Sequence, residues 1–135
     1  MVLKGRVVGK GVSKGVALVT REPISFNNGV EPTTGCVIEV GHELYGQKIT
    51  GRVLVFPVGK GSTGGSYVLY DLADRGLAPA AIINSRGDPV IVTGCIMGKI
   101  VLVHRCDKDP VENIRTGDWV EVDAERGVVI VTREE

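Results

Sequence analysis

The segment VFPVGKGSTGGSYVLYDLADRGLAPAAIIN, residues 55–84, decides the fold. The apolar run Arg52–Phe56, whose end it contains, predicts a buried strand, and the apolar run Ala80–Asn84 predicts a second one. Between them, Ser66–Arg75 predicts an amphipathic helix with one apolar face, made of Val68, Leu69, Leu72 and Ala73. The order strand, helix, strand predicts a βαβ unit with two parallel strands and a right-handed crossover.

Gly76 and Pro79 follow the predicted helix as its C-terminal stop signals. The glycine-rich loop Gly59–Gly65 precedes it, at the carboxyl end of the first strand, where α/β sheets hold their ligands. Glycines there let backbone N–H groups converge, and a helix N-terminus favours an anion or a developing negative charge. The loop lacks the Gly-Lys-Ser/Thr ending of a nucleotide-binding P-loop. A simple turn in which Ser66 caps the helix fits the same residues.

The rest of the chain is predicted to be rich in strands. Glycine-flanked runs at Arg6–Val8 and Val16–Thr20 indicate a hairpin or a tight barrel corner. Further strands are predicted at Cys36–Val40 and Ile100–His104, with a C-terminal hairpin made of 119–122 and 128–132, and Val90–Met97 fits a helix or a strand. The polar loop Asn27–Gly35 is predicted to be a contact surface. The fold class is therefore α/β, with a βαβ unit and a barrel-like β portion.

Composition limits the classes of function. The 135 residues are 43% apolar and 24% charged, which predicts one domain over residues 1–135. Sixteen basic residues balance sixteen acidic ones and only 4% are aromatic, so nucleic acid is not an expected partner. The start of the chain lacks an apolar core of signal-peptide length, and no apolar run approaches the roughly 20 residues of a membrane span. We expect a cytoplasmic protein that does not contact a membrane.

The cysteines and histidines of this chain do not show the spacing of a metal-binding site. Three cysteines lie far apart without a C-x-x-C pair, and we interpret them as core or surface thiols: Cys36, Cys95 and Cys106. Neither histidine has a catalytic context, since His104 alternates with apolar strand residues and His42 fits the surface of a loop. Polar residues after the second strand of the unit are interpreted as turn formers, namely Asn84, Asp88 and Pro89.

The segment quoted above, with GVSKGVALVTREPISFNNGVEPTTG (residues 11–35) and TGDWVEVDAERGVV (residues 116–129), resembles the small subunit of the aconitase X family. The resemblance covers nearly the whole chain. It implies a swivelling β/β/α domain that pairs with a larger subunit carrying a 4Fe-4S cluster, while this chain itself binds no metal. It also implies that Ser62, in GKGST, is the catalytic base. Substrate contacts are expected from its neighbours in the loop: Gly61, Thr63, Gly64 and Gly65.

One position departs from the family pattern, since Gly64 stands where a bulkier apolar residue is common. Lys60 is interpreted as a solvated surface residue rather than a source of charge for the site. Thr63 and Ser66 are interpreted as loop and cap residues rather than catalysts. The interface with the larger subunit is expected to include the Asn27–Gly35 loop and the face that carries Ser62.

The activity implied by the resemblance is the dehydration of (R)-5-phosphomevalonate to trans-anhydromevalonate 5-phosphate, in a modified mevalonate route to isoprenoids. A cluster iron would act as Lewis acid on the leaving hydroxyl, and a serine alkoxide would take the proton next to the carboxylate. Backbone N–H groups at a helix N-terminus can stabilise such an anion. Two alternatives stay open: the small subunit of a cis-3-hydroxy-L-proline dehydratase, and a non-catalytic swivel or carrier module that passes phosphate through a histidine.

Overall fold

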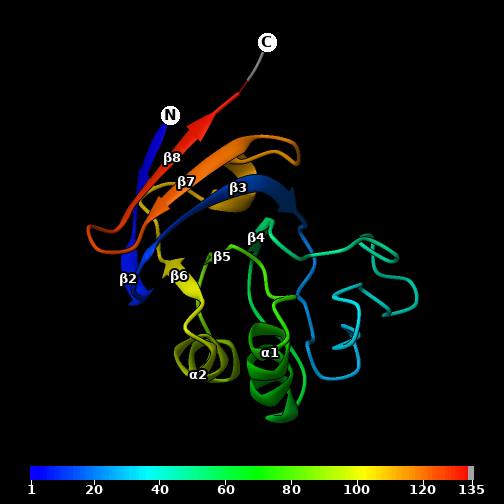
Figure 1. Ribbon diagram of the computed structural model, residues 1–135. Helices are drawn as coiled ribbons and strands as arrows, with labels where there is room; N and C mark the ends of the chain where they lie inside the picture. The colour runs from blue at the N-terminus through cyan, green and yellow to red at the C-terminus, as the bar shows by residue number, and fades with distance from the viewer. Residues whose placement is uncertain (134–135) are drawn as a thin grey trace.

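The computed structural model describes residues 1–133, and its strands form one eight-stranded sheet in the order β1-β8-β7-β3-β4-β5-β6-β2 (Figure 1). The strands are β1 (Val2–Lys4), β2 (Arg6–Gly9), β3 (Val12–Val19), β4 (Val53–Phe56), β5 (Ala81–Asn84), β6 (Val101–His104), β7 (Trp119–Asp123) and β8 (Val128–Thr132). The helices are α1 (Gly64–Asp74), α2 (Pro89–Gly98) and α3 (Pro110–Asn113). The strands β3, β4, β5 and β6 are parallel to one another, whereas β7 pairs in antiparallel fashion with β3 on one side and β8 on the other.

The two ends of the sheet are joined through one residue. Gly5 separates β1, which pairs with β8, from β2, which pairs with β6. The sheet therefore closes on itself through a single kinked segment, which confirms the barrel-like β portion. A side chain at Gly5 would place its Cβ 2.6 Å from Cγ1 of Val103, so the kink requires glycine.

Side chains along the parallel strands point alternately to the two faces of the sheet, so the core is divided into two clusters. Val53 and Val55 of β4 join an apolar cluster inside the barrel, to which every strand except β2 contributes fully buried residues. Leu54 and Phe56 point the other way and pack under α1 and α2, which cover this face of the sheet (Figure 1). A strand whose two faces are both buried is apolar throughout, as β4 is. The result is a layered α/β fold, as predicted.

The predicted βαβ unit is confirmed. β4 and β5 are parallel, α1 connects them, and Gly76 adopts the left-handed conformation, with φ +72°, directly after the cap residue Arg75. The segment with two possible structures, Val90–Met97, is helical and belongs to α2.

Three predictions about residues 36–66 are wrong. Ser66 does not cap α1, because the helix begins at Gly64 and its cap residue is Thr63. Cys36–Val40 is not a strand: only isolated bridges join Val30 to Val37 and Cys36 to Lys48. Left-handed glycines on either side of this segment, Gly35 and Gly41, turn the chain before a ladder can extend. His42 is not on the surface, since only 5% of it is exposed.

Residues 20–52 contain no helix or strand and form a long connection beside α1 (Figure 1). It is packed by its own apolar residues, which join the cluster under the helices: Ile24, Phe26, Val30, Val37, Leu44 and Ile49. The connection therefore brings its residues next to the glycine-rich loop.

Candidate functional site

The glycine-rich loop runs from the end of β4 to the first turn of α1. Ser62 and Thr63 are exposed, and Gly61 has a φ of +101°, a conformation that favours glycine. The carbonyl oxygen of Ser62 accepts a hydrogen bond from the amide of Gly65 at 3.0 Å. Within residues 1–133, the amides of Ser62, Thr63 and Gly64 donate to no acceptor. Unpaired N–H groups at the start of an eleven-residue helix favour negative charge.

The long connection holds one side of this loop. The amide of Lys60 donates to the carbonyl of Ile24 at 3.0 Å, and the amide of Ile24 donates to the carbonyl of Val58 at 3.3 Å. Ile24 and Gly59 thereby form a short parallel bridge. The backbone on the N-terminal side of Ser62 is fixed by these bonds.

Asp88 holds the other side. Its Oδ2 accepts a hydrogen bond from the amide of Gly59 at 2.8 Å, and its Oδ1 accepts from Val90 and Ile91 at 3.0 and 3.2 Å. The last two bonds make Asp88 the N-cap of α2, with Pro89 as the first helical residue, so the interpretation of these two residues as turn formers is wrong. One carboxylate therefore ties the glycine-rich loop to the start of the second helix.

Asn27 of the long connection reaches Ser62 directly. Its side-chain amide donates from Nδ2 to Oγ of Ser62 at 2.5 Å, and Ser25 Oγ donates to the Asn27 carbonyl at 2.7 Å. Sequence reasoning placed Asn27 at the edge of a partner-binding loop and missed this contact. Thirty-five residues separate the two side chains, and no local pattern links them.

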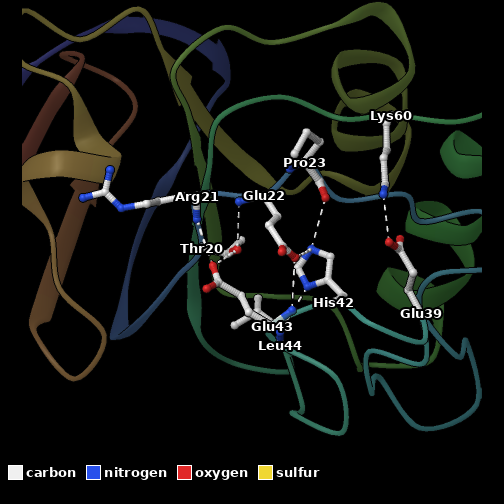
Figure 2. A network of polar contacts seen from close by, with 9 residues as sticks. All are labelled: Thr20, Arg21, Glu22, Pro23, Glu39, His42, Glu43, Leu44 and Lys60. Carbon is white, nitrogen blue, oxygen red and sulfur yellow. Dashed lines mark hydrogen bonds and ion pairs between the residues drawn. The ribbon is translucent and has the colours of Figure 1, made fainter.

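Lys60 is paired, although its side chain is 46% exposed. Its ammonium group lies 2.8 Å from Oε2 of Glu39, and Figure 2 shows the two side chains turned toward each other. The interpretation of Lys60 as a surface residue is compatible with this exposure. The nearby carboxylate also offsets the positive charge that Lys60 would lend to Ser62.

His42 joins two parts of the long connection, near residues 23 and 44 (Figure 2). Its Nε2 donates to the carbonyl of Pro23 at 3.1 Å, and its Nδ1 accepts from the amide of Leu44 at 3.1 Å. Both ring nitrogens are thus bound to backbone groups, which accounts for the burial that the sequence did not indicate. Next to it, the Thr20 hydroxyl donates to Glu43 and holds the pKa of that carboxyl below its usual range.

Comparison with known proteins places this chain in a family. A family model described as the aconitase X swivel domain matches residues 2–131. The chain belongs to this family. The swivel domain is 49% identical to the phosphomevalonate dehydratase small subunit of Methanocella arvoryzae, over 96% of this chain and 98% of that protein. It is 46% identical to the protein of the same name from Methanocaldococcus jannaschii, over 96% of each chain.

A solved structure supports the same assignment. The crystal structure of Thermococcus kodakaraensis aconitase X in its holo form matches the swivel domain with a TM-score of 0.93. The two sequences are 42% identical, and the match covers 98% of this chain and 99% of that one. The names of the relatives describe a small subunit, which implies a larger partner subunit.

The cysteines of the swivel domain do not fit an iron–sulfur cluster. Burial raises the pKa of Cys95 to about 12 and that of Cys106 to about 11, so both thiols are neutral in this structure. Cys36, the third cysteine, is half-buried. Among the 133 residues that the structure describes, no three Cys, His, Asp or Glu side chains gather as a metal site would require.

The remaining candidate residues have structural partners. His104 lies at the end of β6, as predicted, and its Nδ1 accepts from the amide of Gly87 at 2.9 Å, while burial lowers its pKa. Asn84 is the last residue of β5 rather than part of a turn, and its Nδ2 donates to the carbonyl of Phe56 at 3.0 Å. Its Oδ1 is buried without a partner within the described part of the chain.

A shallow hollow of about 250 Å³ lies between α1 and α2 beside the loop. Its lining combines hydroxyl and apolar groups: Thr63, Ser66, Tyr67, Pro89, Val90, Thr93 and Met97. Thr63 belongs to both the hollow and the glycine-rich loop, so the two features are continuous. Separately, none of the helices in residues 1–133 has the length and apolar character needed to cross a membrane.

Proposed function

We propose that this swivel domain is the small subunit of a phosphomevalonate dehydratase. The enzyme is a hydro-lyase that removes water from (R)-5-phosphomevalonate to give trans-anhydromevalonate 5-phosphate, in a modified mevalonate pathway to isoprenoids. The observation that carries the proposal is the 49% identity to a subunit of that name over 98% of its length. Activity requires the larger subunit, since the relatives are named as small subunits.

Ser62 is the proposed base of this reaction. Its alkoxide takes a proton from the carbon next to the substrate carboxylate. The electron pair of that C–H bond forms the new double bond, and the hydroxyl group leaves from the neighbouring carbon. A serine hydroxyl is a weak acid, so the alkoxide needs stabilisation. Support for this role comes from the exposed position of Ser62 two residues before α1 and from the unpaired amides beside it.

The other loop residues divide between binding and support. The free amides of Thr63 and Gly64 suit the binding of a carboxylate or phosphate oxygen of the substrate. The amide of Gly65 is already bonded to the Ser62 carbonyl, and Gly61 supplies the turn, so both support the conformation of the loop. We assign the iron–sulfur cluster to the larger subunit, because no three Cys, His, Asp or Glu side chains gather in the described part of this chain.

The test is Ser62→Ala in the complex reconstituted from both subunits. We expect kcat to fall by about 10²- to 10⁴-fold, as for loss of a general base, while KM and subunit assembly change little. Ser85→Ala is the matched control, because its hydroxyl has only a 3.5 Å contact to Asp109. A Ser62→Ala complex within a few-fold of wild type would overturn the assignment of the base. Turnover of cis-3-hydroxy-L-proline in place of phosphomevalonate would overturn the substrate.

A further inference from the structure

We infer that Asn27 is a positioning residue for Ser62, whose amide orients the serine oxygen and stabilises the negative charge that forms on it. This inference rests on the proposed role of Ser62 as the base. It adds a residue from a different part of the chain to the site. It also assigns a function to the part of the long connection that contains Asn27.

The contact itself has the required direction. The Nδ2 group of Asn27 donates to Oγ of Ser62 at 2.5 Å, and an amide NH₂ group cannot accept a hydrogen bond. The serine oxygen is therefore the acceptor, and its own proton points elsewhere and can be removed. A hydrogen bond from a neutral donor strengthens when its acceptor becomes an anion. Asn27 thus favours the alkoxide over the hydroxyl and lowers the pKa of the serine.

The neighbouring residues are arranged to keep Asn27 in this place. Ser25 Oγ donates to the backbone carbonyl of Asn27 at 2.7 Å, which fixes the turn that carries the amide. A Cβ at Gly61 would lie 2.5 Å from Ser25 Oγ, and a Cβ at Gly64 would lie 2.9 Å from both Cγ and Oδ1 of Asn27. Two glycines on either side of Ser62 therefore leave room for the segment that presents the amide.

The first experiment measures the effect of Asn27 on the anion without using the dehydratase reaction. In the full-length chain carrying Cys36→Ser, the substitution Ser62→Cys places a titratable thiol at the site. Cys95 and Cys106 have pKa values of about 12 and 11, so they compete little for an alkylating agent near neutral pH. The rate of alkylation by iodoacetamide at position 62, followed against pH by mass spectrometry, reports the pKa of that thiol.

We expect Asn27→Asp to raise this thiol pKa by about one unit or more, because a carboxylate repels a thiolate where the amide stabilised it. Asn27→Ala is expected to raise it less. Asn28→Asp is the matched control, since it adds the same charge at the next, exposed residue and should shift the pKa much less. An unchanged thiol pKa in Asn27→Asp, or a shift no larger than that of the control, would overturn the inference.

The second experiment uses the assembled enzyme. Asn27→Ala should lower kcat by about 10- to 100-fold, the value of a hydrogen bond to a charged group, with KM within a few-fold of wild type. Asn27→Asp should lower kcat further at an unchanged melting temperature. Gly64→Ala offers an independent variant, because its methyl group displaces the amide while Asn27 itself is kept.

The outcomes separate this inference from the proposed function. If Ser62→Ala removes turnover and Asn27→Ala leaves kcat unchanged, Asn27 is not a positioning residue and Ser62 remains the base. If Ser62→Ala leaves turnover unchanged, the proposed base is wrong, whereas the thiol measurement still tests the effect of Asn27 on an anion at position 62.

Discussion

The carboxylate of Asp88 joins the glycine-rich loop to α2, so its removal should weaken both. Asp88→Ala deletes the N-cap of α2, which costs about 1 kcal/mol of the free energy of unfolding. It also leaves the half-buried amide of Gly59 without its charged acceptor, which costs roughly 1.5 to 3 kcal/mol. We expect a total loss of about 2.5 to 4 kcal/mol.

Asp88→Asn separates the two contributions. Its side-chain oxygen can still accept from Val90 and Ile91, and asparagine is as good an N-cap as aspartate. The NH₂ group that replaces Oδ2 cannot accept from the Gly59 amide, so this variant should lose only about 1.5 to 3 kcal/mol. Because Ser62 lies three residues after Gly59, we also expect kcat of the reconstituted complex to fall.

Urea unfolding of the isolated chain, followed by circular dichroism, gives both free energies if the slope m is unchanged. Glu125→Ala, an exposed position in the turn after β7, is a control for the loss of an acidic residue. An Asp88→Ala variant that unfolds within about 0.5 kcal/mol of wild type would refute the connection described here. An Asp88→Asn variant as unstable as Asp88→Ala would also refute it. The bond to Gly59 and the cap of α2 would then not make separate contributions.

Three further predictions concern other contacts. The Arg133 guanidinium donates to Asp118 at 2.8 and 3.0 Å and holds the pKa of that carboxyl below its ordinary value of 3.8. The stability it contributes is present above about pH 4 and lost on further acidification, so the melting temperatures of wild type and Asp118→Asn should converge below that pH; a constant difference would contradict this. Ser66→Ala removes a partly buried hydrogen bond to the Val90 carbonyl and should cost about 1 kcal/mol in urea unfolding. A tenfold loss of turnover would show that Ser66 acts in the site. Replacing Cys36, Cys95 and Cys106 together should leave the iron content of the complex unchanged, and loss of iron would identify one of them as a ligand.

The βαβ unit could be predicted because its signals are local. β4 is apolar throughout, α1 has one apolar face, and Gly76 follows the helix in the left-handed conformation. The ambiguous segment Val90–Met97 also carried a local signal, since Asp88 and Pro89 are typical N-cap and first-turn residues of a helix. The short helix α3 begins with the same kind of pair, Asp109 and Pro110. It was not predicted, although this local signal was present.

Other features depend on contacts between distant segments. Ser66 lies inside α1 because its hydroxyl bonds to the Val90 carbonyl of the neighbouring helix, although serine before an apolar face is a typical cap. His42 is buried because Pro23 and Leu44 occupy its two nitrogens. Neither partner can be read from the residues around these positions, and tertiary contacts override local preference in both cases.

The glycines around Ser62 show how the same residues can suggest one role in the sequence and serve another in the fold. A run of glycines before a helix is typical of a backbone cradle for an anion. Here each of the four glycines in 59–65 makes room for a side chain from elsewhere, since a Cβ would meet, in chain order, Asp88, Ser25, Asn27 and Val90. Of the amides in the loop, those of 62–64 donate to no acceptor within residues 1–133. The glycines therefore act mainly by letting two other segments, residues 25–27 and 88–90, fix the backbone around Ser62. Substitutions at these positions should consequently alter the placement of the serine, and so kcat, before they alter the binding of substrate.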